Sequence, residues 1–361
     1  MVESGDDRFV EGNEMRFCRL LIIWMIVIAG PRAGRACDLC GCYTPQVEAM
    51  PDMTPISSFA PSWMSGLYGA VAEQFTHFGT VLVDGREVSN PTGQYENSSV
   101  TQLVTGYTIN NRFALQLNVP IIYRDFKRPE GFAIDRGTES GLGDITLLFK
   151  SVAFHYSSPG RREFEVSGKN PIAVEHEPDF TVSAVLLTGL KLPTGDSSRL
   201  KEEFHEVNVP GAPPSGIHGH DLTLGTGSYD GVFGELTSLR YKNFFAETSL
   251  QFTLRGDGLH QYHFANDLSW EGGPGYYLVR NRQTIVGLQF IVTGEHKDVD
   301  RFRGKPADDT GITSLFVGPR IIASRGRWSA EMDVDLPVLV DNTALQVVPD
   351  YRLRGGISFH F

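Results

Sequence analysis

Long hydrophobic runs are scarce in this sequence. The longest, Leu20–Gly30, has 11 residues, whereas a membrane-spanning helix needs about 20. Mean hydropathy is −0.16, so apolar residues are in no general excess. These values exclude a bundle of transmembrane helices. They do not exclude a spanning β-barrel, because apolar and polar residues alternate along its strands.

Cysteine is also rare, and it is confined to one end of the chain. The sequence has four cysteines and none after Cys42. A large domain without cysteine suits an oxidising compartment, where stray thiols would form crosslinks. We therefore expect an exported protein.

Positive charge is in deficit. The formal net charge is −11 and the pI is about 5.4. Binding to nucleic acid requires a basic surface that neutralises phosphates. This charge balance argues against nucleic acid as a partner.

The N-terminus has the order of a secretory signal. Arg16 and Arg19 precede the apolar run, and the small-residue stretch 33–36 follows it. A basic segment, a short apolar segment and a small-residue cleavage site predict a signal peptide over residues 1–36. Residues 1–14 are acidic, unlike the start of a signal, so translation from Met15 is the alternative.

Three cysteines follow the expected cleavage site directly. Cys37, Cys40 and Cys42 form the sequence CDLCGC, within a segment 37–61 that we expect in the periplasm. Their spacing allows a disulfide, a soft metal bound by thiolates or a lipid on Cys37. Structural zinc normally needs a fourth ligand. We expect no cofactor, with a metal at this cluster as the alternative.

Alternating polarity dominates residues 62–361. In the segment 351–361, apolar residues occupy most odd positions, whereas Arg352, Arg354, Ser358 and His360 occupy even positions. Successive side chains of a strand point to opposite faces. This segment therefore predicts a strand with one apolar and one polar face.

The chain ends on Phe361, with apolar residues two and four positions earlier. This ending resembles the terminal strand that the outer-membrane barrel assembly machinery recognises. We therefore expect that machinery and outer-membrane lipids among the partners.

The alternating segments predict an all-β fold, a transmembrane antiparallel up-and-down β-barrel of about 12 strands, with 10 to 14 as the range. The expected strands are 63–79, 94–109, 111–124, 140–155, 179–193, 219–241, 244–256, 260–279, 283–296, 310–324, 327–340 and 349–361. The segment 154–178 is long for a turn, and 219–241 could form two strands.

The connections alternate in length, as in bacterial barrels with short periplasmic turns and long external loops. Tight turns are expected at 109–111, 241–243, 280–282 and 325–327, and long polar loops near 79–93, 124–139, 193–218, 296–310 and 340–348. An even number of strands places both ends of the barrel in the periplasm.

Charged residues on the polar faces are candidates for lining the lumen. The candidates are Arg112, Glu247, Arg255, Asp267, Glu271, Glu331, Asp333, Asp335, Arg352 and Arg354. On the last two strands, an acidic row can face a basic row, and opposite charges on neighbouring strands attract. The row forms either a structural ion-pair network or a charged constriction that selects solutes.

Three short motifs occur in order along the barrel region. They are Ser140-Gly-Leu-Gly-Asp144, Leu187-Thr-Gly-Leu-Lys-Leu-Pro-Thr-Gly-Asp196 and Leu224-Gly-Thr-Gly-Ser-Tyr-Asp230. Their order and spacing resemble the outer-membrane transporter-like family named for the meta pathway of phenol degradation, over roughly residues 60–361. The resemblance implies a barrel for uptake of aromatic or other hydrophobic compounds.

The motif residues also have a structural interpretation. Pro193 ends a strand, and Gly195 with Asp196 turns the chain, while Gly141 and Gly143 allow a bulge before Asp144. The third motif contributes Gly225, Gly227 and Asp230.

No residue pattern predicts catalysis, so we expect a protein that is not an enzyme. His218-Gly-His220 could bind a metal, although exposed histidines in polar loops usually have no such role. The leading hypothesis is a channel for passive uptake or efflux of a small solute, hydrophobic or aromatic. The alternative is a barrel scaffold whose Cys-containing tail binds a metal, redox or protein partner.

Overall fold

A computed structural model describes residues 66–361, except 160–161, 168–169, 176–177, 207–208 and 282. The expected signal peptide and the segment with Cys37, Cys40 and Cys42 lie outside the described residues. Among the described residues, no helix has the length and apolar character to cross a membrane.

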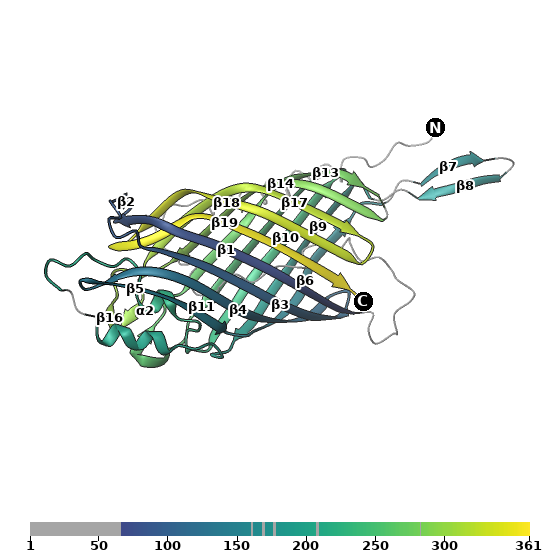
Figure 1. Cartoon of the computed structure of the whole chain (residues 1–361). Coiled ribbons are helices and arrows are strands. Elements are labelled where there is room, and N and C mark those ends of the chain that lie inside the picture. Colours follow the sequence, from purple (N-terminus) through teal and green to yellow (C-terminus); the bar gives the residue numbers. More distant parts are fainter. Residues whose placement is uncertain (1–65, 160–161, 168–169, 176–177, 207–208, 282) are drawn as a thin grey trace, which may run out of the picture. The chain divides into compact units, whose positions relative to one another are not determined.

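Twelve antiparallel strands form a closed barrel (Figure 1). One sheet of 14 strands closes because β19 pairs with β1, while β2 and β5 are side strands of this ring. The expected number of strands is thus confirmed. In ring order they are β1 (Leu67–Val83), β3 (Tyr95–Asn110), β4 (Phe113–Glu130), β6 (Thr146–Ser157), β9 (Phe180–Lys191), β10 (Asp230–Tyr241), β11 (Phe244–Leu254), β13 (Asp267–Arg280), β14 (Thr284–Lys297), β17 (Ile312–Arg325), β18 (Trp328–Asn342) and β19 (Leu345–His360).

Alternation sorts the side chains between the outer and inner faces of the ring. On β18, Met332 is 60% exposed and Leu336 52% exposed, whereas Asp333 between them is 2% exposed. On β19, Ile357 is 57% exposed and Arg354 is 4% exposed. The apolar outer face fits a bilayer, because hydrocarbon accepts apolar side chains and the closed ring pairs the backbone groups.

One end of the barrel, the turn end, carries the tight turns. Two to three residues connect β3 to β4, β10 to β11, β13 to β14 and β17 to β18. At the same end, the long connection between β6 and β9 contains a separate hairpin of β7 (Arg162–Ser167) and β8 (Asn170–Glu175). The segment 154–178 therefore contains the end of β6 and this hairpin rather than a single turn.

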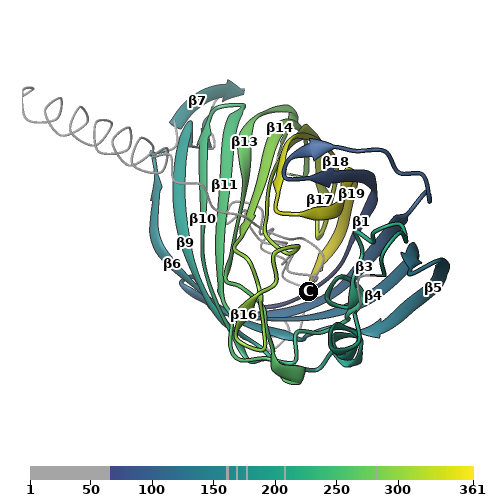
Figure 2. The ribbon, with the colours of Figure 1, turned by 90° about the vertical axis from the view of Figure 1, so that its left-hand side faces the viewer.

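The other end, the outer end, carries the longer connections and faces the viewer in Figure 2. Its short elements are β2 (Arg86–Glu87), β5 (Ala133–Leu142), η2 (Ser198–Phe204), α2 (Gly219–Leu222), η3 (Leu259–Gln261), β12 (Tyr262–His263), β15 (Arg301–Phe302) and β16 (Lys305–Pro306). The strand expected over 219–241 is one strand, but it begins only at Asp230 and a short helix precedes it.

The prediction of a long loop at 340–348 is wrong. β18 continues to Asn342 and β19 starts at Leu345, so only two residues connect them. The polar residues here serve the turn: Asn342 donates its side-chain amide to the Ala344 carbonyl at 3.0 Å, and the Ala344 amide donates to Asp84 at 2.9 Å. Their polarity belongs to a tight turn with side-chain hydrogen bonds.

Candidate functional site

Ion pairs between β18 and β19 line one wall of the lumen. The pairing register places Asp333 opposite Arg354 and Asp335 opposite Arg352. Arg354 Nε lies 2.8 Å from Asp333 and its guanidinium lies 3.1 Å from Asp335. The expected acidic row therefore faces the basic row.

Arg354 also reaches across the lumen to Glu271 on β13. The distance from Arg354 Nη1 to Glu271 Oε2 is 2.7 Å, although β14, β17 and β18 lie between the two strands in the ring. Arg320 of β17 joins them, 3.1 Å from Glu271 and 3.0 Å from Asp333. The contact between Arg354 and Glu271 therefore crosses the lumen instead of running along its wall.

Arg352 extends this lumen network toward β14. Its guanidinium lies 3.2 Å from Glu295 and 3.9 Å from Asp335, and stacks 4.3 Å from the ring centroid of Phe316. A guanidinium held by two carboxylates and an aromatic ring is well fixed in place. We call this set, Arg320, Arg352, Arg354, Glu271, Glu295, Asp333 and Asp335, the lumen network.

The remaining lumen candidates lie elsewhere. Glu247 and Glu331 are on the inner face but outside the ion pairs of the lumen network. Arg255 and Asp267 belong to a second network at the outer end. Arg112 is not in the lumen: it lies in the exposed turn between β3 and β4, because the strand begins two residues later than expected.

The three sequence motifs meet at the outer rim of the barrel. Asp144 accepts hydrogen bonds from the backbone amides of Gly195 and Thr226, at 2.9 and 2.8 Å. Lys191 lies 3.4 Å from Asp144 and 3.6 Å from Asp230. The aspartates of the first and third motifs thus flank the lysine of the second motif.

Asp230 continues this rim network to the next strands. It accepts a hydrogen bond from Ser228 at 2.6 Å and one from the Gly256 amide at 3.1 Å. Arg255 lies 2.9 Å from Asp230 and 2.6 Å from Asp267. We call these groups, Asp144, Lys191, Asp230, Arg255, Asp267 and Thr226, the rim network.

Two motif glycines let the backbones approach. A Cβ on Gly195 would lie 2.8 Å from Gly225 Cα, and a Cβ on Gly225 would lie 2.7 Å from Asp144 Oδ1. Any larger residue would push the second and third motifs apart. The structural interpretation of the motifs therefore agrees with their packing.

The other motif residues serve the same rim. Gly143 donates its amide to the Pro120 carbonyl at 2.9 Å, and Pro193 follows the last residue of β9. Asp196 accepts from the Ser198 amide at 2.8 Å, which turns the chain. Gly141 pairs with Ile122 near the end of the hairpin strand β5, and Gly227 has a φ of +68°.

The connection between β9 and β10, residues 192–229, folds into the outer end of the lumen. Its Ile217 and Leu222 pack with the strand residues Phe78, Phe126 and Val347 in one apolar cluster. We call this connection the mouth loop. Burial of its apolar side chains is the main force that holds it inside the ring.

Hydrogen bonds tie the mouth loop to one side of the ring, from β19 to β4. Gly216 donates to the side chain of Gln94 at 2.8 Å and accepts from the Val347 amide at 3.0 Å. Arg124, paired with Glu96 at 3.3 Å, donates to the Thr223 carbonyl. A buried ion pair of the wall thus carries part of the loop.

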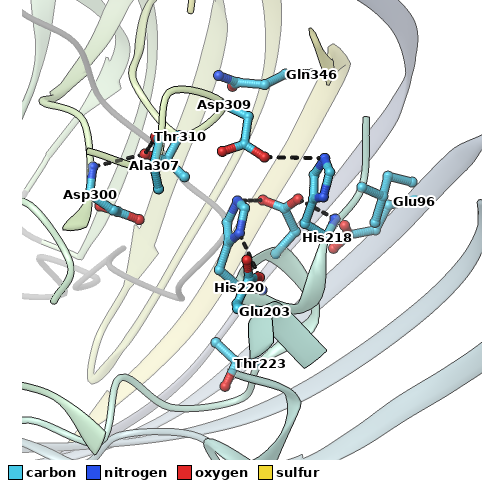
Figure 3. A network of polar contacts seen from close by, with 12 residues as sticks. Glu96, Glu203, His218, His220, Thr223, Asp300, Ala307, Asp309, Thr310 and Gln346 are labelled. Carbon is cyan, nitrogen blue, oxygen red and sulfur yellow. Dashed lines mark hydrogen bonds and ion pairs between the residues drawn. The ribbon is translucent and has the colours of Figure 1, made fainter. Parts of the chain in front are cut away.

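Two histidines of the mouth loop lie among carboxylates (Figure 3). His218 contacts Glu206 and lies 3.3 Å from Asp309 of the connection between β14 and β17. His220 lies 3.0 Å from Glu203 and 3.3 Å from Asp221. The two imidazole rings stack 5.6 Å apart.

Protonated histidines fit this environment. Burial disfavours the charge on His220, but Asp221 and Glu203 outweigh that cost and raise its pKa well above the ordinary value. Burial likewise opposes the charge on Glu203, but His220 lowers the pKa of this carboxyl to about 2. The pKa of His218 is raised, because Glu206 and Asp309 outweigh its burial.

A metal at His218 and His220 does not fit this geometry. Among the described residues, no group of three or more His, Cys, Asp or Glu side chains is placed to hold a metal ion. Each histidine instead contacts carboxylates as an ion-pair partner.

The sequence analysis missed three charged members of these networks. Glu295 and Arg320 occupy inner-face positions of β14 and β17, and Lys191 occupies one of β9. The same alternation that identified Arg352 would have found the first two. The meeting of Lys191 with two other motifs could not be found in that way, because it depends on the folding of the loops.

The ring and its networks define an outer-membrane-type β-barrel with an ionic lumen. No protein-family model matches the sequence, and no curated protein sequence matches it. The resemblance to the phenol-degradation family therefore stays a prediction.

Solved structures of other barrels are similar to this chain, and the first of them shares its fold. An outer-membrane channel of Pseudomonas putida is 15% identical, with a TM-score of 0.51, and the match covers 85% of this chain and all of that one. The β-domain of the Bordetella autotransporter BrkA is 10% identical over 82% of this chain and all of that chain, with a TM-score of 0.41. The NalP translocator domain of Neisseria meningitidis is 11% identical over 82% of this chain and 88% of that chain, with a TM-score of 0.37.

Proposed function

We propose that this protein is an outer-membrane channel for the passive movement of a small solute. The observation that carries the proposal is the closed ring of twelve strands with an apolar outer face and an ionic inner face. Such a ring crosses a bilayer without an exposed backbone edge. The fold shared with the Pseudomonas putida outer-membrane channel supports this function.

The inner face favours a solute with both an apolar and a charged part. Leu148, Leu187, Val232 and Leu236 are buried on the inner faces of β6, β9 and β10. In the ring, these three strands lie opposite β17, β18 and β19, which carry the arginines of the lumen network. These apolar residues form a patch beside Lys150, and a patch that faces a charged wall can contact the apolar end of an amphipathic solute while the wall contacts the charged end.

Assembly in the outer membrane is part of the proposal. Phe361 packs edge-on against Phe359 with ring centroids 4.9 Å apart, and its amide donates to the Leu67 carbonyl at 3.0 Å. The terminal residue thus lies where β19 pairs with β1 and closes the ring. The assembly machinery would release the last strand at this place. Outer-membrane lipids would then cover the apolar outer face.

Conductance in a planar bilayer tests the channel. The purified protein should give discrete current steps in KCl, and liposomes that contain it should swell in an isotonic solute. Cells should carry it in the outer-membrane fraction, with a gel mobility that changes on heating. Absence of both conductance and swelling, for a protein that shows the heat-dependent shift, would contradict the channel.

A further inference from the structure

Two carboxylates of the lumen stand apart from the ion pairs. Glu247 of β11 and Glu331 of β18 take part in no ion pair or hydrogen bond in the described part of the chain, and both side chains are partly exposed. Asp333 and Asp335, which arginines hold, are 2% and 0% exposed. Glu247 and Glu331 are therefore available to a solute.

Carboxylates outnumber cations around Glu247 and Glu331. The carboxylates of Glu271 and Glu331 repel that of Glu247, and Arg320 attracts it. Glu271 and Asp333 repel the Glu331 carboxylate, and Arg320 and Arg354 attract it. Arg320 already lies 3.1 Å from Glu271 and 3.0 Å from Asp333. A further positive charge would therefore be attracted to this part of the lumen.

An aromatic cluster lies next to both carboxylates on the side of the turn end. Phe245, two residues before Glu247 on the same inner face, stacks on Tyr277 with ring centroids 4.4 Å apart. Ile322, the pairing partner of Glu331, completes the buried cluster. Aromatic faces attract cations and also cover an apolar group.

A buried hydrogen-bond acceptor adds to the same place. Gln289 is 3% exposed and donates its side-chain amide to the Gly273 carbonyl at 2.9 Å. Its Oε1 accepts no hydrogen bond in the described part of the chain. Gln289 pairs with Gly275, over which the ring of Phe245 lies. An unsatisfied buried acceptor is costly, and an N–H donor would remove that cost.

Glycines stand opposite both carboxylates in the pairing register. The pairing partner of Glu247 on β13 is Gly273, and that of Glu331 on β19 is Gly356. Neither glycine has a side chain that could pair with the carboxylate opposite it.

We propose that Glu247, Glu331, Gln289, Phe245, Tyr277 and Ile322 form a lumen cation site that binds the ammonium group of an organic amine with an apolar body. The site names a solute class for the proposed channel and rests on that function. The carboxylates and Gln289 Oε1 accept the ammonium N–H groups, and the aromatic cluster covers the apolar part. A metal ion fits less well, because no group of three metal ligands is present among the described residues.

Titration calorimetry with phenethylammonium tests the site in the purified full-length protein. We expect saturable binding to the natural protein, and binding at least about tenfold weaker to the double variant Glu247→Gln, Glu331→Gln, because the amides keep the shape and remove both charges. The matched control is Glu235→Gln. Glu235 lies on the outer face of β10, where Thr237 donates to it at 2.9 Å, so this variant should bind as the natural protein does.

Two ligand controls separate charge from apolar contact. Phenylethanol has the same apolar body without charge, and phenylacetate carries a negative charge. We expect binding of both to be at least about tenfold weaker than that of phenethylammonium. Equal binding of phenylacetate, or undiminished binding to a double variant that keeps its heat-dependent gel shift, would overturn the site.

A conductance measurement distinguishes the site from the channel. Phenethylammonium should reduce the KCl current of the natural protein and of Glu235→Gln, and this block should be lost in the double variant. If the protein conducts KCl but neither binds phenethylammonium nor is blocked by it, the proposed channel stands and the proposed cation site is overturned. Saturable binding without any KCl current supports the site and contradicts the channel. If the double variant fails to fold, Glu247→Gln alone replaces it, with the same expectation of weaker binding.

Discussion

At the outer rim, Asp144 and Asp230 accept hydrogen bonds from the backbone amides of three loop residues. In the lumen, Asp333 and Asp335 contact the side chains of arginines instead. A backbone amide cannot move without the chain, whereas an arginine can leave one carboxylate for another. The rim network therefore fixes loops, and the lumen network can exchange partners with a solute.

This difference bears on how the sequence motifs are interpreted. The motif residues belong to the rim network, whose geometry needs glycines, a turn and particular aspartates. The lumen network needs only charged residues at alternate positions of strands. The recognisable motifs thus hold the loops in place. The residues that would contact a solute occupy alternate positions of strands and form no recognisable motif.

The substitution Asp144→Ala should have the largest effect. It leaves Lys191 with one carboxylate fewer and removes the acceptor of the Gly195 and Thr226 amides. Breaking a buried ion pair costs about 3 to 5 kcal/mol, so the free energy of unfolding in detergent should fall by about that amount in a urea titration. Asp308→Ala, at an exposed position of the connection between β14 and β17, should change it by less than about 0.5 kcal/mol.

Thr226→Val tests one contact of the rim network. The Thr226 hydroxyl, on a fully buried residue, donates to Asp144 at 2.8 Å. A hydrogen bond to a charged group contributes about 1.5 to 3 kcal/mol, and valine has nearly the same shape. The same urea titration should show a loss of about that size, and an unchanged stability would mean that the rim network does not hold the loops.

Arg354→Ala should change the conduction of the protein. It removes the side chain that reaches from β19 to Glu271, so the KCl conductance should rise by about twofold and the reversal potential should shift toward cations. Arg136→Ala, at an exposed position of β5, is the matched control. An unchanged conductance and reversal potential in Arg354→Ala would show that the lumen network does not lie in the ion path.

The smallest expected effect is a dependence of the conductance on pH, which comes from the mouth loop. The pKa values of His218 and His220 are raised by their carboxylate partners, so their ion pairs hold the loop fully below about pH 6.5, the ordinary histidine value. This stabilisation is lost as the pH rises through the raised pKa values of the folded protein. The KCl conductance should therefore increase modestly from pH 6 to pH 9.

A histidine variant tests whether His218 causes this pH dependence. His218→Ala should conduct more at pH 6 than the natural protein and should respond less to pH, because one set of loop contacts is already gone. His205→Ala, in an exposed part of the same loop, should keep the natural response. If both variants behave alike, the pH dependence does not come from His218.

Much of this architecture follows from the sequence alone. The count of twelve strands and the pairing of the acidic row with Arg352 and Arg354 depend on alternation and on neighbouring strands, which the sequence displays. The contact of Arg354 with Glu271 depends on the curvature of the ring, which brings strands four positions apart within reach. No local pattern carries that information.

The loops were harder to predict for a different reason. Polar residues near 340–348 predicted a long loop, yet Asn342 and Asp84 hold a two-residue turn with their side chains. The mouth loop is polar enough to predict exposure, but Ile217 and Leu222 bury it in the ring. In both places, contacts with distant residues decide whether a polar segment is exposed.

The seam between β1 and β19 has a consequence for the way the chain can be cut. The Phe361 amide donates to the Leu67 carbonyl at 3.0 Å, so the two ends of the ring are adjacent although nearly 300 residues separate them along the chain. The ring itself has no natural first strand. A short linker across this seam, with new ends at the exposed turn residue Lys242, would give a circularly permuted barrel. In that barrel β19 would lie in the middle of the chain and would no longer be the last strand to be synthesised.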